Sequence, residues 1–417
     1  MTTAYPSRFF APPAQTVERA RSELQAELAE MIEATAYSLL DPERLLAIAE
    51  DLRLVSRQRT YHSGWVVVSL VLSAMQRSTD TAGRLLDARR TYETLTGTAT
   101  QESGFRKKAR QLVPVLHELL RRHMKSLADA ADAPELRGRL TGLRDILVPD
   151  GCAFKLANTL AGLYEGTGQP AELKLHAVYS VRTGGVVSME RTAGSVHDSA
   201  GFNPQWEAGA LYIWDLGYND YDRVIAAIRG AAFVLQRLKS GANPVVIASY
   251  SKDGVRREIR DEDGRRVRLE AACACGLVHH DRILDLDVEL SDETGTVVVR
   301  VVCVPFGGED RYYLTSLPRA LFTPHDIAEL YRMRWEIELF FRGLKGGLRL
   351  DEVRRLAHPD SLDVIVSASL LGAVLARDLT TRLNALSAAE SASPEAFPPG
   401  AAGVHLRDAR RVSLRPS

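Results

Sequence analysis

One stretch, Thr323–Lys345, constrains this chain more than any other part of its sequence. Its residues are TPHDIAELYRMRWEIELFFRGLK, and between Pro324 and Gly343 neither Pro nor Gly interrupts them, which predicts a single helix. Thr323 suits the N-cap and Pro324 suits the first helical position. The predicted helix is apolar on most sides but also carries charges, and charges seldom lie on a buried helix without partners.

Four polar residues of this stretch fall on one face of the predicted helix. They are Tyr331, Arg334, Glu338 and Lys345, separated by 3, 4 and 7 residues. At about 100° per residue, these steps return to the same side of a helix. The pattern therefore lines up one carboxylate, two cations and a phenol. The simpler alternative is a row of surface ion pairs, which implies no function.

The spacing Tyr-x2-Arg-x3-Glu-x6-Lys resembles the signature of insertion-sequence transposases of the DDE class, in the branch named YREK after these four residues. The resemblance implies an RNase H-like catalytic domain in which Glu338 is the third metal-binding carboxylate. It also requires two aspartates upstream, each at the end of a β-strand. Asp150 and Asp215 meet this requirement, because each follows a short apolar run that is predicted to be a strand.

The predicted fold class is α/β, an RNase H-like mixed sheet flanked by helices, with an all-α N-terminal domain and a β-rich insertion. Helices are expected near Asn203–Gly209 and at Asp220–Arg229, between the later strands of the sheet. The strands predicted for this sheet are Asp145–Pro149, Lys174–Val181, Val186–Thr192, Leu211–Trp214 and Ala232–Leu238.

We expect five parts along the chain. The YREK branch carries a β-rich insertion between the fifth strand and the Glu338 helix, and this chain is expected to have one there. The strands predicted for the insertion are Val245–Tyr250, Val267–Ala272, Ile283–Leu290, Val297–Val304 and Tyr312–Leu317. A helix at Ser361–Leu383 should pack back on the core. The parts are a helical DNA-binding domain with an N-terminal arm (1–140), the first part of the catalytic domain (141–240), the insertion (241–315), the second catalytic part with the Glu338 helix (316–385), and a disordered tail (386–417).

Charge is distributed unevenly, although the chain as a whole is neutral with 53 Lys and Arg and 53 Asp and Glu. From Asp51 to Lys125 there are 14 Lys and Arg against 6 Asp and Glu. A helix expected from about Gln101, after a Thr- and Gly-rich turn, suits contact with phosphates, and a second, linker helix is expected at Ala128–Leu140. The alternative for the first helix is an ordinary solvated basic face. Its cations are Arg106, Lys107, Lys108 and Arg110.

The resemblance also implies the chemistry of the site. Asp150, Asp215 and Glu338 would hold two Mg²⁺ ions, with Mn²⁺ as a substitute, and Asp150 would bridge them. Double-stranded DNA, both the terminal inverted repeats and the target, would be the partner of a homodimer in the synaptic complex. The enzyme would cut and join element ends by hydrolysis followed by strand transfer. The residues expected to touch this DNA near the site are Tyr331, Arg334, Lys345 and Lys239.

Two departures from the family pattern leave a second hypothesis about function open. Asp150 is followed by Gly151 and Cys152 where relatives commonly have Ser and Thr, and Leu216 stands where they commonly have Arg. These changes, together with the neutral charge, are consistent with a decayed or repurposed transposase that mainly binds DNA. A third alternative, an unrelated hydrolase with paired carboxylates such as a glycosidase, is opposed by the cations around Glu338.

The remaining motifs indicate location and supporting roles. Few cysteines indicate a reducing compartment, and no apolar run is long and continuous enough to span a bilayer, so a cytoplasmic, nucleoid-associated protein without membrane contact is expected. Cys273-x-Cys275 before His279 and His280 could suggest zinc, but the spacing is not a standard one. His197–Asp198 matches a Gly-x-x-His-Asp patch of the family, interpreted as supporting structure. Candidate stacking platforms for an unpaired base are Tyr250, Tyr312 and Tyr313.

Overall fold

The structure is a computed structural model, and it describes residues 40–55, 61–75, 83–129, 135–136, 138–201, 205–218, 220–239, 241–278 and 283–392. The predicted N-terminal arm, the pair His279 and His280, and the C-terminal part of the predicted tail lie outside these residues. Residues Pro42–Val374 form one compact unit, and the elements described below belong to it up to that point.

A set of helices precedes the sheet, as predicted. The apolar helix α3 is buried on almost every side, which agrees with a central position among its neighbours. The expected linker helix at Ala128–Leu140 is wrong, because α6 ends at Ala128 and Gly138–Leu140 is a single 3₁₀ turn, η1. The helices are α2 (Pro42–Asp51), α3 (Ser63–Met75), α4 (Arg84–Thr96), α5 (Glu102–Gln111) and α6 (Val113–Ala128).

The central sheet has the predicted RNase H-like order, β3-β2-β1-β4-β5. The first three strands pair antiparallel, whereas β1 pairs with β4 and β4 with β5 in parallel. All four residues of β4 are buried, as is typical of a central strand covered on both faces. The strands are β1 (Ile146–Lys155), β2 (Glu172–Ser180), β3 (Gly185–Ala193), β4 (Leu211–Trp214) and β5 (Phe233–Arg237).

Two details of this segment differ from the prediction. Asp150 does not end its strand, because β1 continues to Lys155 through antiparallel pairing with β2. The helix expected at 203–209 is absent from the described residues of that range. The helix in this connection is instead the short α7 (Asp198–Gly201). The helix α8 (Tyr221–Arg229) is confirmed, with Asp220 as its N-cap.

The insertion extends the central sheet, since β11 pairs antiparallel with β5 and the order continues β11-β10-β9-β6-β7. The predicted strand Val267–Ala272 is wrong: a two-residue β8 (Val267–Arg268) leads into helix α9 (Leu269–Ala274). The short β7 escaped prediction because its residues are all charged and exposed. The other strands are β6 (Val245–Tyr250), β7 (Arg256–Glu258), β9 (Leu284–Asp292), β10 (Gly295–Phe306) and β11 (Glu309–Thr315).

One hydrophobic core runs through both parts of the sheet. It contains Trp214 of β4 and Val234 of β5 together with Leu286 of β9 and Val301 of β10. In β9 buried and half-buried residues alternate along most of the strand, as expected for a strand with one covered face. The insertion therefore shares the core of the catalytic sheet.

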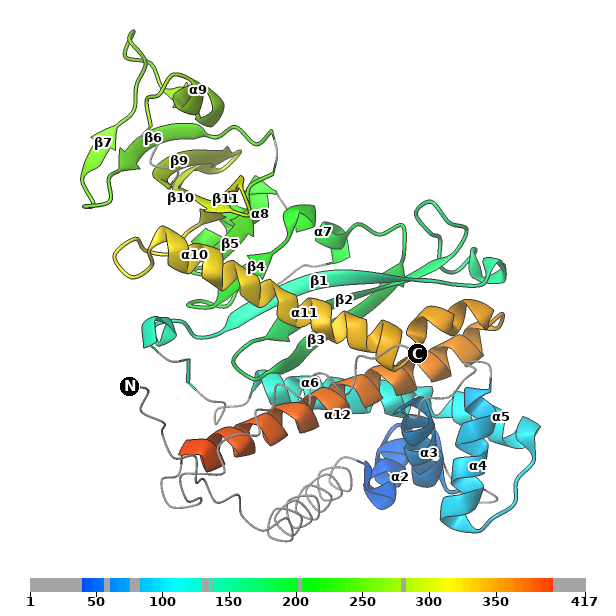
Figure 1. Cartoon of the computed structure of the whole chain (residues 1–417). Coiled ribbons are helices and arrows are strands. Elements are labelled where there is room, and N and C mark those ends of the chain that lie inside the picture. The colour runs from blue at the N-terminus through cyan, green and yellow to red at the C-terminus, as the bar shows by residue number, and fades with distance from the viewer. Residues whose placement is uncertain are drawn as a thin grey trace, which may run out of the picture. The chain divides into compact units, whose positions relative to one another are not determined.

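The stretch that opened the sequence analysis is helical throughout, but it is not one regular helix. Its start is confirmed, because Thr323 and Asp326 form a capping box and Pro324 occupies the first turn. The stretch begins and continues as α-helix, tightens to a 3₁₀ turn from Arg332 and widens to a π-helical turn from Gly343. Its segments are α10 (Pro324–Tyr331), the 3₁₀ turn η4 (Arg332–Arg334), α11 (Trp335–Arg342) and the π-helical turn η5 (Gly343–Gly347). In Figure 1, α11 runs across β1 and β2, whereas α10 lies beside β5, β10 and β11.

The last described helix is α12 (Pro359–Ala392), reached through the 3₁₀ segment η6 (Leu350–Arg355). It confirms the predicted helix at 361–383 but runs into the predicted disordered tail. Within the described residues, its segment Pro359–Arg377 is apolar enough and long enough to cross a membrane by length and composition. Because 72% of that stretch is buried inside the protein, it is better explained as a core helix.

A buried arginine joins the helical part to the end of the signature stretch. The side chain of Arg84, at the start of α4, donates one hydrogen bond to the Ser369 hydroxyl at 3.0 Å and another to the Leu348 carbonyl, just after η5. Arg84 is 3% exposed, and burial lowers the pKa of its guanidinium. Three elements distant in sequence are thus held by one side chain.

Replacing Arg84 by Met should lower the free energy of unfolding by about 2 kcal/mol, because the half-buried Leu348 carbonyl and the buried Ser369 hydroxyl lose their charged donor. Differential scanning fluorimetry measures the change. The matched control is Arg90→Met on the same helix, whose side chain is 66% exposed and which should change stability by less than about 0.5 kcal/mol. Equal losses in the two variants would contradict the anchoring role of Arg84.

Candidate functional site

Three carboxylates from distant parts of the chain surround one guanidinium. The side chain of Arg334 lies 2.5 Å from Glu338 Oε1, and its Nη1 lies 3.9 Å from Asp150 Oδ2 and 3.9 Å from Asp215 Oδ2. The side chains of Arg334, Asp150 and Glu338 are 15%, 21% and 30% exposed and that of Asp215 is 43% exposed, so the charges are partly shielded from solvent.

The sheet register explains why the two aspartates meet. In the parallel pair β1 and β4, Leu147 stands opposite Tyr212. Three residues further on, the same register brings Asp150 level with Asp215, although β4 has ended at Trp214. Neighbouring strands lie about 4.8 Å apart, so these positions are necessarily close. The third carboxylate comes from α11, which packs against β1 and β2.

Backbone amides orient the two aspartates. The amide N–H of Gly151 donates to Asp150 Oδ1 at 2.8 Å, and that of Leu216 donates to Asp215 Oδ1 at 2.7 Å. In each case the donor is the residue that follows the carboxylate. The remaining oxygens, Asp150 Oδ2 and Asp215 Oδ2, are those nearest Arg334.

The other signature residues also contact this region. The Tyr331 hydroxyl donates a long hydrogen bond of 3.4 Å to Asp215 Oδ1, and its ring lies 5.3 Å from that of Tyr313. Lys345 Nζ lies 5.5 Å from the centre of the Phe154 ring on β1, which is within cation–π range. Phe154 shares a face of β1 with Asp150 by strand alternation, so Lys345 lies further along the same face.

The pKa shifts of Asp150 and Arg334 show how strongly the carboxylates and the guanidinium interact. Burial raises the pKa of Asp150 to about 6; Arg334 lowers it, and the nearby Asp215 and Asp198 raise it. Burial acts to lower the pKa of Arg334, but Tyr331, Asp215 and Glu338 outweigh this effect and raise it. Carboxylates that repel one another in a partly buried place are stabilised by a cation between them.

The predicted DNA-contacting residues outside the signature lie elsewhere. In α5, Arg106 pairs with Glu102 at 2.7 Å and Arg110 with Asp360 at 3.4 Å, while burial lowers the pKa of Lys108. Lys107 is exposed on the same helix. Lys239 lies just after β5 and lines a cavity of about 760 Å³. None of the interactions found in the described part of the chain connects these five residues to the carboxylates.

The stacking prediction is contradicted for Tyr313, which is 3% exposed and presents no open ring face. The Arg319 guanidinium lies 3.5 Å from the centre of the Tyr250 ring, and Tyr312 is half-buried. Cys273 lies on helix α9 rather than on a strand, and Cys275 follows it. Within the described ranges, no zinc-binding group of His, Cys, Asp or Glu is present there.

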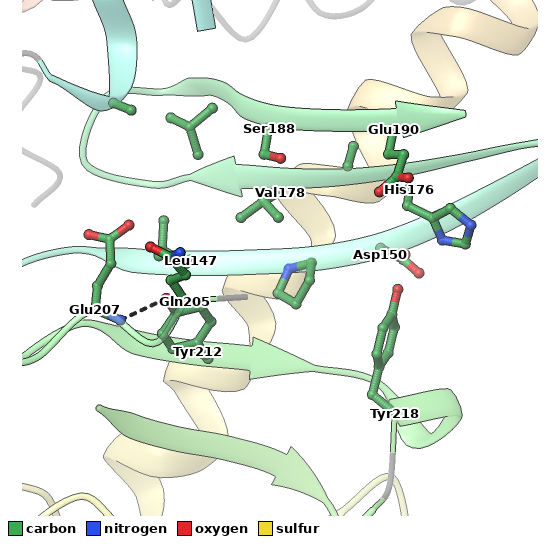
Figure 2. A pocket seen from close by; sticks show the side chains of 14 residues that line it. Leu147, Asp150, His176, Val178, Ser188, Glu190, Gln205, Glu207, Tyr212 and Tyr218 are labelled. Carbon is green, nitrogen blue, oxygen red and sulfur yellow. Dashed lines mark hydrogen bonds between the residues drawn. The ribbon is translucent and has the colours of Figure 1, made fainter. Parts of the chain in front are cut away.

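A cavity of about 290 Å³ adjoins Asp150 (Figure 2). Its lining includes Leu147 of β1 and Val178 of β2, with Glu190 and Glu207 among the polar residues around them. By strand alternation, Leu147 points to the face of β1 opposite the Asp150 side chain. Figure 2 shows Asp150 and Tyr218 at one end of the cavity. Its acidic lining does not suit a phosphate backbone.

The family assignment comes from the sequence profile of the transposase DDE domain, which matches residues 143–358. This chain belongs to that family. The matched range contains all three carboxylates and the whole signature stretch. Membership of the transposase DDE family also excludes the alternative that this chain is a glycosidase.

Relatives agree with the assignment over different lengths. The putative transposase InsL of insertion sequence IS186A from Escherichia coli K12 is 41% identical over 66 residues, which is 16% of this chain and 18% of that protein. The IS231E transposase of Bacillus thuringiensis subsp. finitimus is 20% identical over 77% of this chain and 74% of its own. The piggyBac synaptic complex with hairpin DNA has a TM-score of 0.34 at 9% identity, covering 89% of this chain and 81% of that one, a likeness too low for inference.

The family implies dependence on a divalent metal ion, and the donor chemistry here fits one. Carboxylate oxygens are the ligands that Mg²⁺ and Mn²⁺ prefer. In the described residues, however, no three acidic, His or Cys side chains stand close enough to form a metal-binding group. The guanidinium of Arg334 lies between the carboxylates instead. Asp150, Asp215 and Glu338 are the residues that would hold the ion.

This arrangement predicts how Arg334→Met should behave. Without metal, the variant should lose about 1–3 kcal/mol of stability, because the carboxylates repel one another without the cation. Added Mn²⁺ should raise the melting temperature of the variant more than that of the wild type, since the ion replaces the missing charge. Arg342→Met, at an exposed position of the same helix, is the control. An equal Mn²⁺ effect on all three proteins would show that the carboxylates do not share a cation.

Proposed function

We propose that this protein is a DNA transposase that cuts and joins the ends of an insertion sequence by two-metal phosphoryl transfer, hydrolysis first and strand transfer second. The observation that carries the proposal is the convergence of Asp150, Asp215 and Glu338 on Arg334, within a chain of the transposase DDE family. The activity, the substrate and the partners of the whole protein are part of this proposal.

We further propose membership of the YREK branch. Its four signature residues are present at the required spacing, and each contributes to one acidic region or to the strand beside it. A row of unrelated surface ion pairs would not place Tyr331 against Asp215 or Arg334 among three carboxylates. The contacts therefore favour the functional interpretation of the signature.

Within the site, the residues would divide the work as follows. Asp150, Asp215 and Glu338 would hold two Mg²⁺ ions, for which Mn²⁺ can substitute. Such ions, when bound, activate the attacking hydroxyl and stabilise the leaving oxygen of a phosphodiester. Arg334 balances the carboxylates and can turn toward a phosphate, for which its planar guanidinium is suited. Lys345, on η5 beside Phe154 of β1, would contact the neighbouring phosphate.

The proposed partner is double-stranded DNA, first the terminal inverted repeats and then the target, bound by a homodimer in the synaptic complex. Residues 1–140 would form the DNA-binding domain with its arm, and 141–240 with 316–385 the catalytic domain interrupted by the insertion 241–315. Residues 386–417 would form the tail, of which 386–392 are helical. We expect the protein in the cytoplasm, associated with the nucleoid.

The alternative of a decayed transposase that mainly binds DNA receives less support. All three carboxylates are retained, and the amides of Gly151 and Leu216 still orient two of them. Leu216 donates through its backbone, so the replacement of the commoner Arg does not remove this contact. These substitutions therefore leave the backbone contacts that orient Asp150 and Asp215 in place.

Cleavage of a labelled duplex that carries the terminal repeats flanking the gene tests the proposal. With Mg²⁺ or Mn²⁺, the wild type should nick at the repeat boundary, and Asp150→Asn, Asp215→Asn and Glu338→Gln should each reduce the rate by at least about 10³-fold while still binding the repeats. Tight binding without nicking by the wild type would favour the decayed transposase. Neither binding nor cutting would refute the proposal.

The contribution of α5 to DNA binding can be measured separately. Lys107→Gln should weaken repeat binding about uniformly across sequences and reduce the slope of log affinity against log salt by about 1. Arg106→Gln should have a smaller effect, because Glu102 already engages that guanidinium. Lys252→Gln, in the turn after β6, is a control for net charge. An unchanged slope for Lys107→Gln would remove α5 from the DNA interface.

A further inference from the structure

A fourth carboxylate, that of Asp198, packs against the strand that carries Asp150. Asp198 is the first residue of α7, and its Oδ1 lies 2.0 Å from the point where a Cβ on Gly151 would stand. No side chain can be added at Gly151 without displacing this oxygen. Because side chains alternate along β1, Asp198 contacts the face opposite the one that directs Asp150 toward Arg334.

One basic side chain of β2, Lys174, pairs with this carboxylate, and His176 of the same strand lies nearby. In the β1–β2 register, His176 stands opposite Gly151 and Lys174 opposite Ala153, so both flank the glycine on its own face. Lys174 Nζ lies 2.9 Å from Asp198 Oδ1 and donates to the Val196 carbonyl at 3.0 Å. His176 Nδ1 is 3.8 Å from the same oxygen. The Lys174 and His176 side chains are 14% and 3% exposed and that of Asp198 is 29% exposed, so the ion pair is partly buried.

The second oxygen of Asp198 faces the other aspartate-bearing segment. Its Oδ2 lies 3.9 Å from the Cβ position of Gly217, two residues after Asp215. Asp198 therefore lies close to the segments that follow both aspartates. Gly151, within β1, donates its amide N–H to Asp150, and Leu216, next to Gly217, donates its own to Asp215.

We propose that Asp198, held by Lys174, is a positioning residue that fixes the spacing and orientation of Asp150 and Asp215 from the face of the sheet opposite the metal-binding oxygens. The inference rests on the proposed function for the meaning of that spacing. It also explains Gly151: the glycine provides the space that the Asp198 carboxylate occupies. Ser in this place, as relatives commonly have, requires Asp198 to move.

The test uses two single variants, Asp198→Asn and Gly151→Ala. It also uses one double variant that combines Gly151→Ala and Asp198→Gly. The readout is the Mn²⁺ concentration for half-maximal nicking of the repeat duplex, alongside the rate at saturating Mn²⁺, repeat binding and melting temperature. Loss of an outer partner of metal ligands typically costs about 10–100-fold in metal affinity or activity. We expect Asp198→Asn and Gly151→Ala to need at least about tenfold more Mn²⁺, with repeat binding unchanged.

The double variant separates crowding from charge. Removing the Asp198 side chain relieves the clash that Gly151→Ala introduces, so the double variant should be folded, but it should keep the raised Mn²⁺ requirement of Asp198→Asn. Asp292→Asn is the matched control, because Asp292 also pairs with one cation, Arg229 at 2.9 Å, but stands at the end of β9 in the insertion. A wild-type Mn²⁺ requirement in folded Asp198→Asn would overturn the proposal.

A second readout keeps this inference distinguishable from the proposed function. If the wild type did not nick DNA, the proposed function would fail, and Mn²⁺-dependent stabilisation would still test Asp198. Mn²⁺ should then raise the melting temperature of the wild type at low concentration and of Asp198→Asn only at about tenfold higher concentration, while Asp150→Asn should not respond. Equal Mn²⁺ titrations of wild type and Asp198→Asn would exclude a positioning role.

Discussion

The charge balance around Arg334 is the constraint on which the rest of the structure depends. Asp150 and Asp215 reach it from neighbouring strands, and Glu338 reaches it from a helix more than a hundred residues later. Three carboxylates cannot gather in a partly buried place without a cation, because their mutual repulsion adds to the cost of desolvation. Arg334 supplies one positive charge. A divalent ion can supply two, so the same arrangement that is stable with Arg334 is prepared for metal.

The surrounding elements can be understood as supports for these carboxylates. The parallel pairing of β1 with β4 sets the two aspartates level, and the insertion lengthens the same sheet through β11 instead of forming a separate body. Arg84 fixes the chain just after η5 and so restrains the far end of the helical stretch. Stability and positioning are therefore coupled: contacts that hold the sheet together also set the geometry of the acidic site.

Much of this was accessible from the sequence, and the failures have physical causes. The buried run of β4 and the N-cap at Thr323 are local signals, and both were predicted. The continuation of β1 past Asp150 was missed because Gly151 indicates a turn locally, whereas pairing with β2 keeps the strand extended. The position of Arg334 among three carboxylates depends on contacts between distant segments, so sequence spacing alone placed it only on the same helix face as Glu338.

Gly151 shows how such contacts change the meaning of a substitution. From sequence, the glycine was a loss, since a hydroxyl common in relatives is absent beside the first aspartate. In the structure, the same position is filled by the carboxylate of Asp198, which brings a negative charge and a Lys174 ion pair to the back of the strand. Asp198 also lies near Gly217, in the segment that follows Asp215. The glycine is therefore better understood as the space that the Asp198 carboxylate occupies than only as a lost hydroxyl.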